Sequence, residues 1–130
     1  MHVDEAVHAV KFGDLLEKGF YKYDPIEYHG PALNYFSLIP SIFTGKTKFS
    51  ELTEYDLRII PVIASIILLL LILSLFKEFN YKYILLLLFL TAFSSMNLFY
   101  NRYYIQESLL VSFSFSSIVI LQCSLLINGS

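Results

Sequence analysis

The sequence predicts an all-α fold, a polytopic helical membrane protein in which three transmembrane helices follow a polar N-terminal segment. Hydrophobic residues make up 56% of the 130 residues and charged residues only 15%, whereas soluble domains hold about 25% charged residues. The apolar excess is also concentrated, because the stretch from Ile59 to Ile127 contains only five charged residues. Long apolar stretches of this kind indicate helices that cross a membrane.

Three apolar runs predict the spanning helices, at about residues 59–76, 83–99 and 108–127. The first run has no charge over its length, and at 1.5 Å per residue it reaches about 27 Å, close to the thickness of a bilayer's hydrocarbon core. The third run contains several serines. Serine hydroxyls bond back to carbonyls one turn earlier, so we expect this helix to pack inside a bundle.

Residues 1–58 predict an external loop that carries two amphipathic helices at the membrane interface. After Asp4, apolar residues recur at helical spacing up to Lys18, and Gly19 is a typical helix stop. The second segment, Ala32 to Phe43, is too short to cross the membrane and apolar enough to lie in its interface. Basic residues flank both ends of the first spanning run, so the charge distribution alone does not fix the orientation.

Several short motifs occur in order along the chain. Asp4-Glu5-Ala6-Val7-His8 is followed by Tyr23-Asp24-Pro25, by Tyr28-His29-Gly30-Pro31 and by Leu57-Arg58-Ile59-Ile60-Pro61. This order resembles the first external loop of membrane glycosyltransferases of the dolichyl-phosphate-mannose protein mannosyltransferase type, in the GT-C superfamily. It is most similar to the archaeal and bacterial branch associated with flippase activity. The run from Tyr100 to Ser108 is similar to a later loop of that family.

The resemblance implies transfer of a sugar from a polyprenyl-phosphate donor to a protein or lipid-linked acceptor. It implies that Asp4, with Glu5 beside it, is the catalytic base that deprotonates the acceptor hydroxyl. It further implies that Arg102 holds the donor phosphate, and that His29 and Glu107 contribute to substrate binding. The acidic pair is also compatible with a divalent metal. The location implied is the cell membrane, multi-pass, with the N-terminal loop outside.

Each of these residues also has a structural interpretation. Asp4 is suited to capping a helix N-terminus, and Arg102 is suited to snorkelling at the interface beside Glu107. His29 is interpreted as structural in the same way. His8 follows Asp4 by one helical turn, but the pattern lacks the first histidine and the third ligand of a zinc-protease helix, which argues against that class. No nucleic-acid-binding pattern is present.

A second functional hypothesis is not enzymatic. Members of the family carry a helix before the acidic pair and many helices after the third crossing, so we expect this chain to be an N-terminal piece of a larger enzyme. A piece of this kind is expected to be inactive alone or to need a partner chain that supplies the missing helices. Alternatively, the chain is a membrane subunit of a lipid-linked oligosaccharide translocation or glycosylation system, binding polyprenyl phosphate without chemistry.

Overall fold

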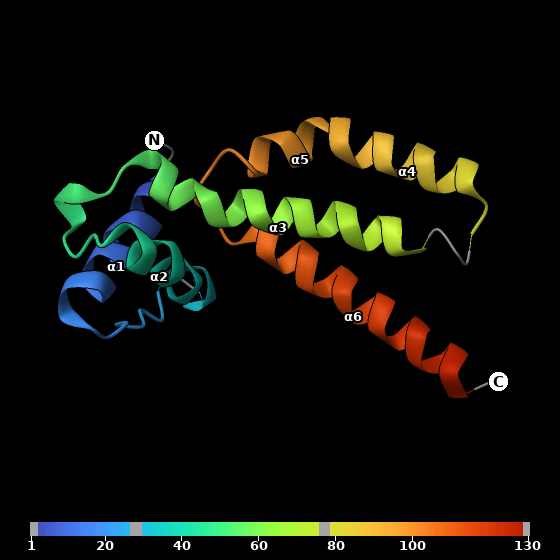
Figure 1. Ribbon diagram of the computed structural model, residues 1–130. Helices are drawn as coiled ribbons and strands as arrows, with labels where there is room; N and C mark the ends of the chain where they lie inside the picture. The colour runs from blue at the N-terminus through green and yellow to red at the C-terminus, as the bar shows by residue number, and fades with distance from the viewer. Residues whose placement is uncertain (1–2, 27–29, 76–78, 129–130) are drawn as a thin grey trace.

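The computed structural model describes residues 3–26, 30–75 and 79–128, and within these ranges it is all-helical, without a strand. The order is α1 (Val3–Lys18), α2 (Ala32–Thr44), a 3-10 turn η1 (Phe49–Glu51), α3 (Glu54–Ser74), α4 (Tyr81–Phe93), α5 (Ser95–Tyr100) and α6 (Glu107–Asn128). Figure 1 shows α1 and α2 gathered at one end of α3, here called the head. The long helices α3, α4 and α6 extend away from the head.

Helix α1 ends where its sequence predicts. Gly19 has a left-handed conformation, with φ of 76°, and its N–H donates to the Leu15 carbonyl at 2.9 Å. The buried face of α1 includes Ala9, Phe12 and Leu15, which are apolar residues at helical spacing. At the other end, Asp4 lies inside the first turn and is not an N-cap, because the helix is already formed at Val3. Acidic residues in a first turn still interact favourably with the helix dipole.

Helix α2 begins at the predicted residue, Ala32, and ends at Thr44, one residue after the predicted end at Phe43. Gly45 ends the helix in a left-handed conformation with φ of 68°. Its N–H donates to the Ile42 carbonyl, and the Lys46 N–H donates to the Ser41 carbonyl, both at 3.3 Å. This pair of bonds is the Schellman arrangement, which satisfies carbonyls that the helix end leaves without an intrahelical partner.

Helix α3 is the central element of the long region. Its N-terminus is fixed by the Asp56 carboxylate, which accepts bonds from the Thr53 N–H at 2.7 Å and from the Thr53 hydroxyl at 2.6 Å. Along its length α3 packs against α6, where the Ser112 hydroxyl donates to the Ala64 carbonyl at 2.7 Å. Small side chains at such a crossing let two helices approach closely.

The predicted helix at residues 83–99 is two helices in the structure. Ser94 has a φ of −59° and a ψ of 123°, which takes the chain out of the helix between α4 and α5. The side chain of Asn97 donates to the Thr91 carbonyl at 3.0 Å, which gives a partner to a carbonyl at the end of α4. Serine and asparagine side chains compete with helical backbone bonds in this way.

Two helices, α3 and α6, are long and apolar enough to cross a membrane, whereas α4 is a shorter apolar helix. Only 33% of the most apolar window of α3 and 17% of that of α6 are buried against the rest of the described chain. Most of their apolar surface therefore faces outward, which distinguishes them from the core helices of a soluble domain.

Candidate functional site

A buried ion pair joins the start of α1 to the start of α3. The Glu5 carboxylate is fully buried and accepts from Arg58 Nε at 2.8 Å and from Arg58 Nη2 at 3.2 Å. Glu5 Oε1 also accepts from the backbone N–H of Tyr104 at 3.1 Å. A buried carboxylate with several charge-assisted donors is strongly held in place. Of the two predicted catalytic carboxylates, Glu5 is thus committed to these contacts.

Tyr104 fastens the loop between α5 and α6 to the head. Its side chain is fully buried, and its hydroxyl makes hydrogen bonds with Asn34 Oδ1 at 3.0 Å and Ser37 Oγ at 2.9 Å, both on α2. The rings of His8 and Phe12, on α1, lie 6.1 and 6.2 Å from the tyrosine ring. Burial raises the pKa of Tyr104 above its ordinary value, so its hydroxyl stays protonated as a donor.

These contacts bring together two segments that are about a hundred residues apart. Asp4 is exposed in α1, directly before Glu5, and Arg102 is exposed in the loop that contains Tyr104. Glu107 is exposed at the first residue of α6. The Asp4 segment and the Arg102 segment therefore lie near each other, through the contact between Glu5 and Tyr104. His29 lies outside the described residues.

A first cleft, the rim cleft, lies between the start of α3 and the loop that contains Asn101 and Arg102, and has a volume of about 370 Å³. Arg58 lies in its wall and is compensated by Glu5 and by Glu54, whose carboxylate is 2.8 Å from Arg58 Nη1. The Arg102 side chain makes no ion pair with the residues described, so its positive charge is uncompensated at this mouth. The described residues that line it are Glu54, Tyr55, Arg58, Val62, Asn101 and Arg102.

A second cleft, the lateral cleft, lies beside the first, between α3, α4–α5 and α6. It has a volume of about 560 Å³, and Asn101 lines both clefts. On α3, Arg58 and Val62 line the rim cleft, and Ser65, one turn further on the same face, lines the lateral cleft. The two clefts thus follow one face of α3 away from the head.

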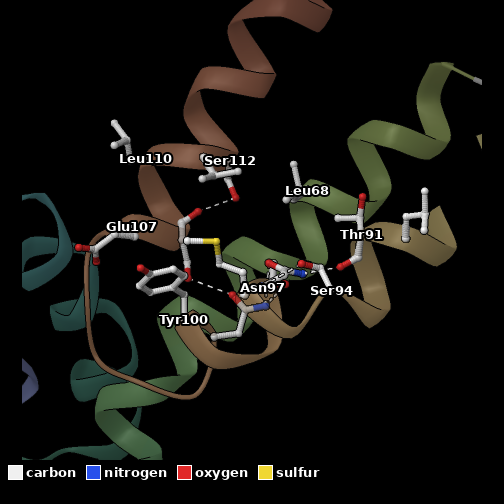
Figure 2. A pocket seen from close by; sticks show the side chains of 14 residues that line it. Leu68, Thr91, Ser94, Asn97, Tyr100, Glu107, Leu110 and Ser112 are labelled. Carbon is white, nitrogen blue, oxygen red and sulfur yellow. Dashed lines mark hydrogen bonds between the residues drawn. The ribbon is translucent and has the colours of Figure 1, made fainter. Parts of the chain in front are cut away.

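The lateral cleft has an apolar wall and a polar floor. Its apolar lining includes Leu68, Leu90, Met96, Leu110 and Val111, and no lysine, arginine or histidine is among the described residues that line it. Figure 2 shows the amide and hydroxyl side chains gathered around Asn97, with Glu107 at one edge. Asn101 links the floor, because its Nδ2 donates to Ser65 Oγ at 2.5 Å and its Oδ1 accepts from Ser108 Oγ at 2.9 Å. The polar groups of this network are largely hydrogen-bonded to one another. The rest of the lining of the lateral cleft is apolar, so it suits an apolar chain.

Among residues 3–26, 30–75 and 79–128, no group of three or more His, Cys, Asp or Glu side chains is placed to hold a metal ion. The described carboxylates at the rim are instead engaged with Arg58, as Glu5 and Glu54 are. No described residue is therefore assigned to the divalent metal that the sequence made conceivable.

Sequence reasoning missed three residues that organise this site, namely Arg58, Tyr104 and Asn101. Arg58 belongs to one of the motifs quoted above, but it was given no role there. Tyr104 lies in the run from Tyr100 to Ser108 together with Tyr100 and Tyr103, and the sequence does not show which of these tyrosines is buried. Asn101 is polar between two apolar runs, which is a usable signal for a polar floor.

Comparison of the chain with protein-family models, with curated proteins and with solved structures finds no match. The resemblance to membrane glycosyltransferases therefore stays a prediction that depends on the motifs and on the geometry above.

Proposed function

We propose that the chain is part of a membrane glycosyltransferase that transfers a sugar from a polyprenyl-phosphate donor to a protein or lipid-linked acceptor. The observation that supports this best is the pair of adjoining clefts along α3, which share Asn101 in their lining. One end offers the uncompensated guanidinium of Arg102, and the other offers an apolar passage that opens sideways. An amphiphile with a phosphate head and a long apolar chain has the matching distribution of polarity.

In this proposal α3 and α6 cross the membrane, and α4 and α5 together form a third crossing. From Tyr81 to Tyr100 the two short helices would reach about 30 Å if collinear, close to the thickness of the hydrocarbon core. The interruption at Ser94 is tolerable at that depth because it faces the lateral cleft, where Asn97 satisfies the Thr91 carbonyl. The head and the Arg102 loop then lie on the same, external side.

The proposed chemistry is a displacement at the anomeric carbon. The acceptor oxygen forms a bond to that carbon while the bond to the phosphate oxygen breaks, and the electron pair leaves with the polyprenyl phosphate. Asp4 takes the proton of the acceptor hydroxyl as general base. Arg102 stabilises the negative charge of the leaving phosphate. Glu5, held by Arg58, positions the start of α1, and Glu107 at the edge of the lateral cleft is placed to accept hydrogen bonds from the sugar.

The acceptor is proposed to approach along the head. A groove of about 610 Å³ runs beside α1, and its lining includes Ala6 and Val7, which lie within one turn of Asp4. The opposite wall is the extended segment from Lys22 to Pro25. A groove with an apolar floor and charged edges suits an extended acceptor segment that ends at the Asp4 carboxylate.

The alternative, a non-enzymatic subunit that binds polyprenyl phosphate, has one observation in its favour. Helix α6 is little buried by the described chain, and the lateral cleft opens between it and α4–α5. Helices of another chain would fit against this side, as in a larger translocation or glycosylation complex.

The two functions are separated by assaying transfer and lipid binding in the same membranes. Membranes from cells expressing the chain would receive a radiolabelled polyprenyl-phosphate hexose and a serine-containing peptide. We expect Asp4→Asn to abolish transfer while the lipid still binds, because the carboxylate is the base and not a lipid ligand. Glu17→Gln, an exposed carboxylate on the same helix that lies outside the acceptor groove, is the matched control and should transfer normally. Unchanged transfer in Asp4→Asn would contradict its role as base, and binding without any transfer in the unmodified chain would favour the subunit.

A further inference from the structure

Helix α2 is folded with its polar side inward. Its buried residues are Leu33, Asn34, Ser37 and Ser41, so three of the four are polar. Its exposed residues include Ile39, Ile42 and Phe43, and the last two are 77% and 86% exposed. A helix on the surface of a soluble protein has the opposite distribution, because exposed apolar area of this size is unfavourable in water.

The protein itself uses the inward polar face. Ser37 Oγ donates to the Leu33 carbonyl at 2.9 Å, and Ser41 Oγ donates to the Ser37 carbonyl at 3.0 Å. The Tyr104 hydroxyl bonds with Asn34 and Ser37 on the same face. The Ser37 and Ser41 hydroxyls and the Asn34 Oδ1 atom are thus engaged inside the head. Its outer face presents large apolar side chains and, like the rest of the helix, no charge.

The depth of α2 follows from its contact with α6. The ring of Phe36 lies 5.8 Å from the ring of Phe113. Phe113 is six residues after Glu107, the charged first residue of α6, so it lies about 9 Å along the helix from that charge. If Glu107 marks the edge of the hydrocarbon core, the Phe36 side of α2 lies below that edge. Phe113 is itself an exposed apolar residue, so the outer faces of α2 and α6 form one apolar surface.

We propose that α2 is immersed in the hydrocarbon of the membrane leaflet on the head side, with Ile39, Ile42 and Phe43 in contact with lipid acyl chains. This rests on the membrane placement of α3 and α6 in the proposed function, and it does not depend on the chemistry at Asp4. The occupant is lipid because the face is uncharged and continues the surface of a spanning helix. Through Tyr104, the immersed helix also sets the height of the rim cleft at the membrane surface.

The chain contains no tryptophan, so single-tryptophan variants report on one position each. Phe43→Trp tests the outer face of α2, with Ile42→Trp as a second variant on the same face. Tyr55→Trp, at the charged start of α3, is the matched control, because Tyr55 and Phe43 are 87% and 86% exposed. Phe89→Trp on α4 reports the spanning region. The full chain in phosphatidylcholine vesicles, at low protein-to-lipid ratio, is titrated with brominated lipids and with aqueous acrylamide.

Immersion predicts that Phe43→Trp and Ile42→Trp are quenched by brominated lipids several-fold more than Tyr55→Trp, with blue-shifted emission and little acrylamide quenching. Acrylamide quenching equal to that of Tyr55→Trp would overturn the proposal, since α2 would then lie in water. Protection from both quenchers would also overturn it, because another protein surface would cover the face. Failure of Phe89→Trp to respond to the brominated lipids would instead reject the membrane placement, and with it the proposed function.

Discussion

The pairing of Arg58 with two carboxylates allows a direct measurement of what the buried ion pair contributes. Glu5 is fully buried and accepts three N–H donors, whereas Glu54 pairs with the same guanidinium but is 60% exposed. Substituting glutamine for either residue preserves the shape of the side chain and removes its charge. The two variants therefore differ in burial more than in geometry.

Glu5→Gln has one acceptor oxygen for three donors, so its amide nitrogen must face an N–H of Arg58 or Tyr104. A charge-assisted bond is lost, and a donor faces a donor in a buried site. We expect a loss of about 2–3 kcal/mol in unfolding free energy, toward the low end for a broken buried pair because Arg58 retains Glu54. Glu54→Gln should cost about 0.5 kcal/mol or less, because solvent screens an exposed pair.

The assay is equilibrium unfolding in mixed detergent micelles, followed by helical circular dichroism. Arg58→Met tests the sign of the effect of Glu5→Gln on the unfolding free energy, because it leaves the Glu5 carboxylate buried without its cation. In that background Glu5→Gln should be neutral or stabilising instead of destabilising. Equal effects of Glu5→Gln and Glu54→Gln, or an unchanged cost of Glu5→Gln beside Arg58→Met, would refute the reasoning.

Four further outcomes are expected from the same unfolding assay. Tyr104→Phe should lose about 1–3 kcal/mol, because its buried hydrogen-bond partners lose the hydroxyl. Burial also raises the pKa of Tyr104. Above pH 10.0, the ordinary pKa of tyrosine, unfolding therefore releases a proton, and the free energy of unfolding should fall as the pH rises past that value. This fall should be smaller in Tyr104→Phe. Ser112→Ala should cost about 0.6 kcal/mol through the lost bond between α3 and α6, whereas Ser117→Ala, exposed on α6, should change little. Gly13→Ala should destabilise by about 1–3 kcal/mol despite the better helix propensity of alanine, since the new Cβ would lie 2.6 Å from Phe49 Cδ2.

The sequence predicted most of the helices because their signals are local. The spacing of apolar residues and the position of Gly19 located α1, and the apolar run after the turn at Pro31 located α2. The uncharged run after Arg58 located α3. Signals of this kind arise within a few residues, so they survive without knowledge of the tertiary contacts.

The break at Ser94 was not predicted, because the apolar residues on both sides of it continue the helical pattern. Competition from Asn97 for the Thr91 carbonyl decides the conformation there, and two or three polar residues give only a weak signal. The inward polar face of α2 was missed for a related reason. Which face of an amphipathic helix is buried depends on its partner, and the partner Tyr104 lies about seventy residues away.

For the candidate site, two predicted membrane crossings separate the Asp4 segment from the Arg102 segment, so the predicted topology puts both on the same side of the membrane. The structure places them in contact through Glu5 and Tyr104. The distinction between Asp4, exposed, and Glu5, buried, could not be predicted, since adjacent carboxylates in one helix differ only in the direction they face. The predicted roles of Asp4, Arg102 and Glu107 in catalysis and binding stay predictions.

The most direct test of the central claim is to find where a polyprenyl phosphate binds. A polyprenyl phosphate that carries a photoreactive diazirine on its chain would be cross-linked to the full chain in vesicles, and the labelled peptides identified by mass spectrometry. The adjoining clefts predict labelling within residues 90–112, competed by unlabelled polyprenyl phosphate but not by polyprenol, and several-fold weaker in Arg102→Gln than in Lys82→Gln. Labelling that is spread over all apolar helices and insensitive to competitor would contradict the account.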